Sequence, residues 1–208
     1  MRWQRHWTPR YVASRMAEIG YQRSFPQEPW LTRDANRALA SLLKPTDVGL
    51  EFGSGRSTIW FARRIAHLTS VEHDEGWYRQ VSQRLKAERV QNVTYLLRKA
   101  TMATGETEPG YTAVAATFAD GSLDFVLVDG ALRGQCALAA LPKLAEGGIL
   151  VIDNVNWYLS SASRSPNSRS PEQGPLDDDW KKVDRAIAGF RKIWTSNGVS
   201  DTAIYFKV

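Results

Sequence analysis

The stretch from Val48 to Thr58 brings an acid and two glycines to the start of a predicted helix. A short apolar run ends at Glu51-Phe52, the loop Gly53-Ser54-Gly55 follows, and helical residues begin at Ser57. A loop of this kind turns the N–H groups of a helix N-terminus toward a ligand and lets the backbone approach it closely. The Glu51 carboxylate can accept hydrogen bonds in the same region. The stretch therefore predicts a ligand-binding turn.

More polar side chains stand where other predicted strands end. Glu72 closes the second apolar run, Asp129 closes the fourth, and Asp153-Asn154 closes the fifth. These polar residues end strands of the same predicted sheet, and the roles expected for them come from the family resemblance described below.

Strands and helices alternate through the part of the chain that carries these residues. The strands are apolar and β-branched, as in a parallel sheet covered on both faces, so the predicted class is α/β, doubly wound and Rossmann-like. Asn197-Gly198 is a strong hairpin signal and predicts a closing antiparallel pair, which makes a mostly parallel sheet of seven strands. The predicted strands are 48–52, 68–72, 93–97, 123–129, 148–153, 190–196 and 201–208. The predicted helices are 11–19, 33–43, 57–66, 77–88, 133–145 with a break near Pro142, and 177–189.

The chain is expected to form one domain with an extension. Residues 1–31 are expected to be an N-terminal extension or cap, and residues 32–208 a single domain. Residues 160–176 are rich in Ser, Pro, Asn and Arg without periodicity. This composition predicts a flexible loop, which is either a lid or an insertion.

Composition narrows the class of protein. The 208 residues include one cysteine, Cys136, which excludes an internal disulfide and a zinc site built from cysteines. No apolar run is long enough for a membrane span, and the N-terminus through Trp7 lacks the apolar segment of a signal peptide. A cytoplasmic location is the simplest expectation. The net charge of +5 is spread along the chain, which favours a solvated basic surface over a nucleic-acid footprint.

The glycine spacing separates two classes of cofactor. Nicotinamide dehydrogenases use Gly-x-Gly-x-x-Gly, whose third glycine lets helix and strand pack closely. Thr58 occupies that third position here, and Glu51 precedes the first glycine by two residues. The pattern is therefore Glu-x-Gly-x-Gly.

Glu51-Phe52-Gly53-Ser54-Gly55 resembles the first motif of class I S-adenosylmethionine-dependent methyltransferases, and the resemblance extends from Trp30 to Val208. It implies that the glycine turn lies at the methionine end of the cofactor and that Glu72 accepts hydrogen bonds from the ribose diol. It also implies adenine contacts from the loop after the third strand. The cofactor-binding residues carried over are Glu51, Gly53, Ser54, Gly55, Glu72, His73, Lys99, Ala100 and Asp129.

The ends of the fourth and fifth strands resemble those of catechol and caffeoyl-CoA O-methyltransferases. In that group an aspartate and an Asp-Asn pair hold a divalent cation, which implies Asp129, Asp153 and Asn154 as ligands of Mg²⁺ or a similar ion. The cation would lower the pKa of an acceptor hydroxyl. The group's catalytic lysine is missing, because Leu132 stands at its position and Arg133 follows. Arg133 cannot act as a base, so either the metal alone activates the acceptor, another group does, or Arg133 binds an anionic acceptor. Asp129 and Arg133 are the candidate catalytic residues.

The segments at residues 51–58, 71–74 and 128–133 resemble those of a bacterial subgroup of small methyltransferases. The leading hypothesis is O-methylation of a small-molecule hydroxyl, and a homodimer is kept open. A methyltransferase acting on RNA or protein and a non-catalytic binding protein of the same fold are the alternatives. An affinity for RNA that falls steeply with salt concentration would favour a methyltransferase acting on RNA.

Overall fold

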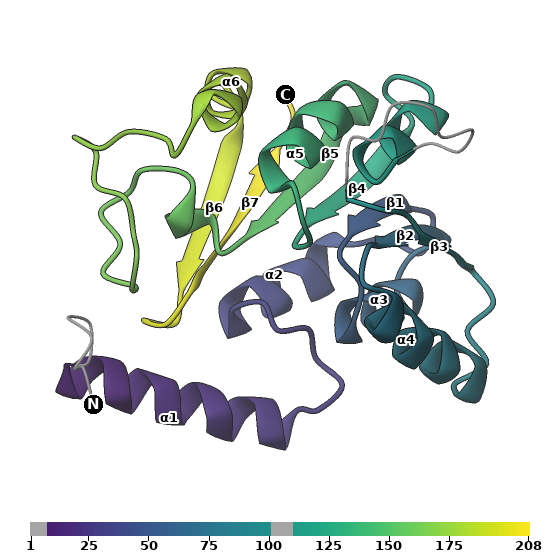
Figure 1. The fold of residues 1–208 in the computed structure, drawn as a ribbon, viewed down its shortest axis with the longest axis horizontal. Coiled ribbons are helices and arrows are strands. Elements are labelled where there is room, and N and C mark those ends of the chain that lie inside the picture. Colours follow the sequence, from purple (N-terminus) through teal and green to yellow (C-terminus); the bar gives the residue numbers. More distant parts are fainter. Residues whose placement is uncertain (1–7, 101–109) are drawn as a thin grey trace.

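A computed structural model describes residues 8–100 and 110–208 and contains one seven-stranded sheet. The strand order is β3-β2-β1-β4-β5-β7-β6 (Figure 1). β1 to β5 are parallel to one another, and β7 runs antiparallel to both β5 and β6. The predicted α/β class, the seven strands and the closing antiparallel hairpin are all confirmed. The strands are β1 Val48–Phe52, β2 His67–Glu72, β3 Val93–Leu97, β4 Leu123–Val128, β5 Leu144–Asp153, β6 Arg191–Ser196 and β7 Asp201–Phe206.

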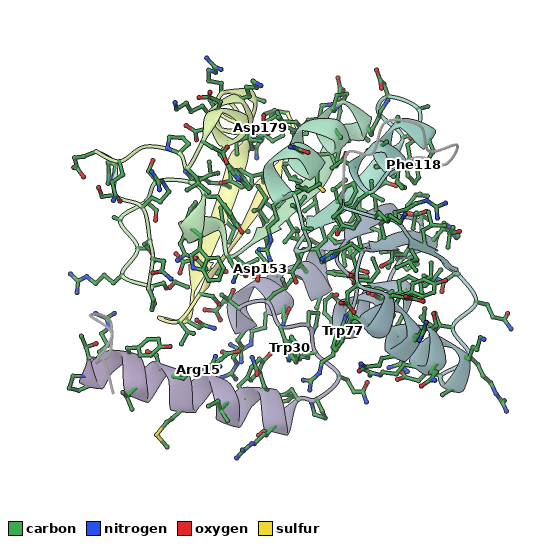
Figure 2. All side chains as sticks on the ribbon, in the orientation of Figure 1. Arg15, Trp30, Trp77, Phe118, Asp153 and Asp179 are labelled. Atoms are coloured by element: carbon green, nitrogen blue, oxygen red, sulfur yellow. The ribbon has the colours of Figure 1, made fainter. Side chains whose placement is uncertain are left out.

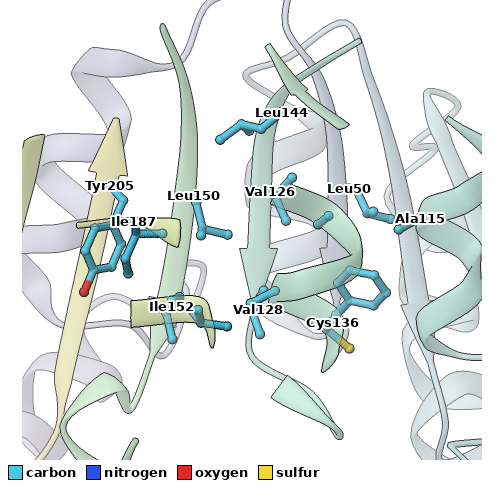
Figure 3. Packing of buried hydrophobic residues seen from close by; sticks show 14 of the residues in the cluster. Leu50, Ala115, Val126, Val128, Cys136, Leu144, Leu150, Ile152, Ile187 and Tyr205 are labelled. Atoms are coloured by element: carbon cyan, nitrogen blue, oxygen red, sulfur yellow. The ribbon is translucent and has the colours of Figure 1, made fainter. Parts of the chain in front are cut away.

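Helices cover both faces of the sheet (Figure 1). α2 Arg33–Leu42 and α3 Arg56–Ala62 pack on one face, and α5 Arg133–Ala140 and α6 Asp178–Ala186 pack on the other. β4 shows why both faces are apolar: Phe125 and Leu127 belong to the core under α2 and α3, whereas Val126 and Val128 belong to the core under α5. Figure 3 shows Val126 and Val128 among the residues of that second core. Successive side chains point to opposite faces, so a strand buried on both sides must be apolar throughout.

The helices α1 and α4 complete the described helical elements. α4 Glu75–Ala87 follows β2, with the Asp74 carboxylate accepting from the Trp77 N–H at its N-terminus. α1 Pro9–Ser24 runs along the edge of the molecule and meets the tip of the β6–β7 hairpin, where the Asn197 amide donates to Glu18 at 2.9 Å. α1 is longer than predicted because it continues through Gly20. A glycine inside a helix costs only about 1 kcal/mol, so a longer helix can contain it.

The region before β5 differs from the sequence prediction. α5 ends at Ala140, a short 3₁₀ turn spans Leu141–Lys143, and β5 begins at Leu144 rather than at Gly148. The ring and missing N–H of Pro142 prevent the helix from continuing. A register shift lies in the pairing with β4 at Leu123/Phe125, and it accommodates the extra strand residues.

The segment after β5 is tied to the sheet by hydrogen bonds. Ser160 and Arg169 form an isolated bridge, the Asn156 amide donates to the Pro166 carbonyl, and the Ser165 hydroxyl donates to Asp201 at 2.6 Å. Its flexibility stays a prediction. The N-terminal residues considered for a signal peptide lie outside the described part. Within residues 8–100 and 110–208, no helix is long and apolar enough to cross a bilayer.

Candidate active site at the carboxyl ends of the parallel strands

The glycine turn is packed directly against the loop that follows β4. Gly53 has a φ of +91°, and a Cβ at this position would lie 2.5 Å from the Gly130 nitrogen. Only glycine tolerates both the backbone conformation and this approach. Gly55 then precedes the first residue of α3, and its N–H donates to the Thr58 hydroxyl at 3.0 Å. Thr58, which replaces the third glycine of the dinucleotide pattern, therefore stabilises the turn.

Glu51 is fully buried beneath the turn, with 0% exposure. Its Oε2 accepts from the Thr58 hydroxyl at 2.6 Å and from the Ser70 hydroxyl at 2.5 Å. Its Oε1 has no hydrogen-bond partner among the described residues. Burial raises the pKa of Glu51 to about 7, although the hydroxyl donors oppose the rise. A buried acceptor atom without a partner is costly, so Oε1 is suited to a donor on a ligand.

Glu72 links the end of β2 to the glycine turn. It is 3% exposed, and its Oε2 accepts from the Ser54 N–H at 3.1 Å and from the Ser54 hydroxyl at 2.7 Å. Its Oε1 accepts from the backbone N–H groups of His73 and Asp74. The Ser54 hydroxyl also lies 2.7 Å from the Tyr95 hydroxyl. The Ser54 hydroxyl can therefore donate to the Tyr95 hydroxyl instead of to Glu72. That change would leave Glu72 Oε2 able to accept from a ligand hydroxyl.

The residues expected near an adenine lie on the same side. His73 Nδ1 is 3.0 Å from Glu72 Oε1, and its ring meets Tyr111 edge-on with 5.6 Å between centroids. The Lys99 carbonyl accepts from the Tyr111 N–H at 3.2 Å, and Ala100 is partly buried against the core. The loop position after Ala100, Thr101, lies outside the described residues. Sequence reasoning missed Tyr111, because no motif or periodicity marks it.

Arg133 is the centre of the contacts between the loops after β4 and β5. Its guanidinium donates to the backbone carbonyls of Gly130, Asp129 and Asp153, and to the side-chain oxygens of Asp129 at 2.9 Å and Asn154 at 3.1 Å. These contacts engage all of its N–H groups, since a guanidinium has five. Arg133 and Asp129 do lie together, as the sequence indicates. In this arrangement Arg133 positions the two loops and has no donor left for an acceptor anion.

The same contacts test the expected metal site. Two of the three expected ligands, Asp129 and Asn154, already face the Arg133 guanidinium. The third, Asp153, accepts from the Thr202 hydroxyl at 2.7 Å. A divalent cation here would share its ligands with a fixed positive charge at hydrogen-bonding distance, which is unfavourable. The residues therefore do not fit a divalent cation.

Asp153 and Asp129 are neighbouring carboxyl groups with different surroundings. Asp153 is 4% exposed and lies near the centre of the molecule (Figure 2). Burial, and then the neighbouring Asp129 carboxylate, raise the pKa of Asp153 to about 8. Burial also raises the pKa of Asp129, but Arg133 opposes this rise. Burial and the neighbouring carboxylate thus favour the protonated form of Asp153, whereas Arg133 stabilises the charged form of Asp129.

A cavity of about 440 Å³ adjoins the outer side of the glycine turn. Its walls include Trp30, Arg56 and Trp77, and Asp129 lies at its edge. The Trp77 indole N–H donates to the Ser54 carbonyl at 2.7 Å, and the Arg56 guanidinium lies 5.1 Å from the Trp30 ring centroid. Arg56 Nη1 is buried without a hydrogen-bond partner among the described residues. Figure 2 shows Trp30 and Trp77 near one another. Sequence reasoning did not single out Arg56 or Trp77, although Arg56 adjoins the turn.

Comparison with known proteins identifies the family. The family described as "Methyltransferase domain" matches residues 50–155, about half of the 208 residues. The chain belongs to this methyltransferase family. Together with the glycine turn, this makes the protein an S-adenosylmethionine-dependent methyltransferase. No curated protein matches the sequence.

Solved structures similar to this methyltransferase share its fold. A candidate caffeoyl-CoA O-methyltransferase from Staphylococcus aureus aligns with a TM-score of 0.59 and 19% identity over 97% of this chain and 93% of its own. An rRNA methylase from Streptococcus thermophilus has a TM-score of 0.56 and 13% identity, covering 85% and 96%. A candidate methyltransferase from Streptococcus mutans in complex with S-adenosylhomocysteine has a TM-score of 0.54 and 10% identity, covering 86% and 99%. Because these proteins differ in acceptor type, the fold leaves the acceptor of this methyltransferase open.

The buried Glu51 carboxyl makes the stability of the methyltransferase depend on pH. Its pKa is about 7 in the folded protein and about 4.5 for a solvated glutamate, so unfolding at a pH between these values releases a proton. The free energy of unfolding should therefore fall as pH rises from about 4.5 to about 7. Glu51→Gln removes this pH dependence. The free energy of unfolding of the variant, measured relative to that of the wild type, should therefore rise between about pH 4.5 and pH 7 by on the order of 3 kcal/mol.

Urea denaturation of both proteins at pH 5 and pH 8 measures this difference. The control is Glu75→Gln, because Glu75 is an exposed acid on α4. An equal change with pH in the wild type and Glu51→Gln would contradict the assignment of a raised pKa to Glu51.

Proposed function

We propose that the enzyme transfers the methyl group of S-adenosylmethionine to a hydroxyl oxygen of a small molecule. The observation that carries this proposal is the carboxyl pair of Asp129 and Asp153, which lies beside the glycine turn. A carboxylate held next to the methyl donor can take the proton that a hydroxyl must lose. Fixed orientation of donor, acceptor and base supplies the rest of the rate enhancement.

The cofactor site is proposed from the contacts on the turn. Backbone N–H groups of Gly53 to Gly55 would approach the methionine end, and the unpaired Glu51 Oε1 would accept from its ammonium group. Glu72 would accept from the ribose hydroxyls while Ser54 keeps its contact with Tyr95. His73, Lys99 and Ala100 would border the adenine.

Side chains of the protein then accept the proton that the hydroxyl group loses. When bound, S-adenosylmethionine supplies an electrophilic methyl group on a sulfonium sulfur. Asp129 accepts the hydroxyl proton at its carboxylate as the oxygen–carbon bond forms and the carbon–sulfur bond breaks. The products are a methyl ether and S-adenosylhomocysteine. Arg133 keeps Asp129 in place, and protonated Asp153 keeps a second negative charge away from it.

We also propose that the reaction needs no divalent cation. Arg133 supplies the positive charge that the related O-methyltransferases obtain from a metal. Turnover in 5 mM EDTA should therefore stay within about twofold of turnover without it, a difference of less than 1 kcal/mol in the barrier. Loss of turnover in EDTA that added Mg²⁺ restores would contradict this proposal.

Arg56 is proposed to hold the carboxylate of the methionine end. Its buried Nη1 lacks a partner, and guanidinium groups bind carboxylates strongly. Arg56→Gln should weaken binding of S-adenosylhomocysteine about tenfold, corresponding to about 1.4 kcal/mol. Arg84→Gln is the matched control, because Arg84 borders the same cavity but is paired with Glu88. Equal loss in both variants would show a general charge effect instead.

Formation of S-adenosylhomocysteine in the presence of phenols, catechols and aliphatic alcohols tests the acceptor class. Turnover with any of them that Asp129→Asn abolishes, while cofactor binding is kept, would support the proposal. The alternative is an RNA acceptor, for which the basic net charge of +5 is the motivation although that charge is spread along the chain. Turnover on RNA with none on the small hydroxyl compounds would establish that alternative. Cofactor binding without turnover on either class would favour a binding protein.

A further inference from the structure

A second hollow of the molecule lies away from the glycine turn. This groove has a volume of about 900 Å³ and lies between the start of α1, residues 160–166 after β5, and the outer strand β6. Figure 1 shows these three segments together at one end of the sheet, where the hairpin tip meets α1. Its volume is in the range of small-molecule sites, about 300–1,000 Å³.

Three cations from three different elements line the groove. Arg10 belongs to α1, Arg164 to the segment after β5, and Lys192 to β6. None of the lining residues is an aspartate or a glutamate. Arg10 and Arg164 form no ion pair or hydrogen bond with other described residues, and Lys192 contacts only the Trp194 ring, at 5.9 Å. The groove therefore has a positive charge that the described protein does not neutralise.

Two buried acids accept hydrogen bonds from residues that line the groove. Asp201 is fully buried behind the wall and accepts from the Ser165 hydroxyl at 2.6 Å and from the Trp194 indole N–H at 2.8 Å. Glu18, a buried residue of α1, accepts from the Asn197 amide. These acids therefore hold the walls together and leave the lining cations available to an anion.

Hydroxyl groups add donors between the cations. Ser161 and Ser163 line the groove, and each accepts a backbone N–H that fixes its hydroxyl oxygen: from Ser163 at 3.2 Å and from Ser165 at 3.1 Å. Their own O–H groups are therefore held in position to donate. The N-terminal end of α1, which is capped by Thr8, also borders the groove and adds its positive dipole.

We propose that this groove binds the phosphate groups of a small phosphorylated compound. Two arginines on facing elements suit phosphate, since a guanidinium contacts two of its oxygens at once. Trp194 provides an aromatic face for the rest of the ligand. The limited volume of the groove and its three cations favour a compact ligand over a nucleic-acid backbone, which needs an extended basic path. The proposal is independent of which hydroxyl compound is methylated.

Calorimetric titration of the full chain with inorganic pyrophosphate and with ADP, at low salt, tests the site. We expect both to bind, and the double variant Arg10→Gln/Arg164→Gln to weaken binding at least tenfold. Arg37→Gln is the matched control, because Arg37 is exposed and paired with Asp34 on α2, and it should change binding less than twofold. Binding of S-adenosylhomocysteine should be unchanged in every variant, which verifies folding and separates this site from the cofactor site.

Three outcomes would overturn the proposal. The first is no binding of pyrophosphate or ADP by the wild type. The second is binding that the double variant leaves unchanged. The third is a single-stranded RNA that binds much more tightly than ADP, with a salt dependence indicating more than three neutralised phosphates, because that result assigns the groove to nucleic acid.

Discussion

Arg133→Met is expected to lower the free energy of unfolding by about 1–3 kcal/mol, because the pair with Asp129 is only partly buried and the main cost is acceptors left without a donor. The variant leaves the Asp129 carboxylate, the Asn154 amide oxygen and three backbone carbonyls without their donor. Both loops at the acceptor side should then lose their fixed positions. Turnover, measured at a temperature where the variant is still folded, should fall at least a hundredfold.

The Arg133→Lys variant tests whether the site needs only the positive charge of Arg133 or also the shape of its guanidinium group. An ammonium group has three donors and cannot span the five acceptors, so lysine should recover less than half of the lost stability. Arg37→Lys, at an exposed pair on α2, should change stability by less than about 1 kcal/mol. Chemical denaturation and initial rates check both variants. Full recovery of stability and turnover in Arg133→Lys would contradict the positioning role and leave only a need for positive charge.

Glu72→Gln is expected to weaken binding of S-adenosylhomocysteine at least a hundredfold. The carboxylate accepts from Ser54 and from two backbone N–H groups, and in the proposed complex it also accepts from the ribose. An amide has one acceptor oxygen, so it cannot keep the turn and the ribose contacts together. Hydrogen bonds to charged groups contribute about 1.5–3 kcal/mol each, so losing the ribose contacts accounts for this factor.

The matched control is Asp74→Asn, two residues further along. Asp74 caps α4 by accepting from the Trp77 N–H, and asparagine caps helices equally well. Equilibrium dialysis with labelled cofactor should show binding close to that of the wild type in Asp74→Asn. A strong loss there with normal binding by Glu72→Gln would mean that the ribose acid has been assigned to the wrong residue.

The sheet could be predicted because its strands are buried on both faces. Runs such as residues 123–128 are apolar at every position, and each predicted strand is present with ends within a few residues. The hairpin followed from Asn197-Gly198. The start of β5 could not be read correctly, because Leu144 to Gly147 pair with the sheet through a register shift that depends on β4.

The sequence predicted which strand ends carry the site, but it did not predict the contacts between the side chains there. Glu51, Glu72 and Asp129 lie at the glycine turn or the strand ends beside it, because strand ends meet at one edge of a parallel sheet. The role of Arg133 depends on two loops folding toward one guanidinium, and sequence spacing does not reveal this. Trp77 reaches Ser54 from α4, and Tyr111 reaches His73 from a separate loop, so both contacts depend on tertiary packing.

Calorimetric titration of S-adenosylhomocysteine into the wild-type chain tests the central claim, that the carboxylates of the glycine turn hold the cofactor. At pH 6.5, in two buffers of different ionisation enthalpy, we expect one site per chain and net release of protons. Glu51 gives up its proton when the ligand ammonium meets Oε1, so Glu51→Gln should abolish the release. Absence of binding, or proton release that is equal in Glu51→Gln, would contradict the account.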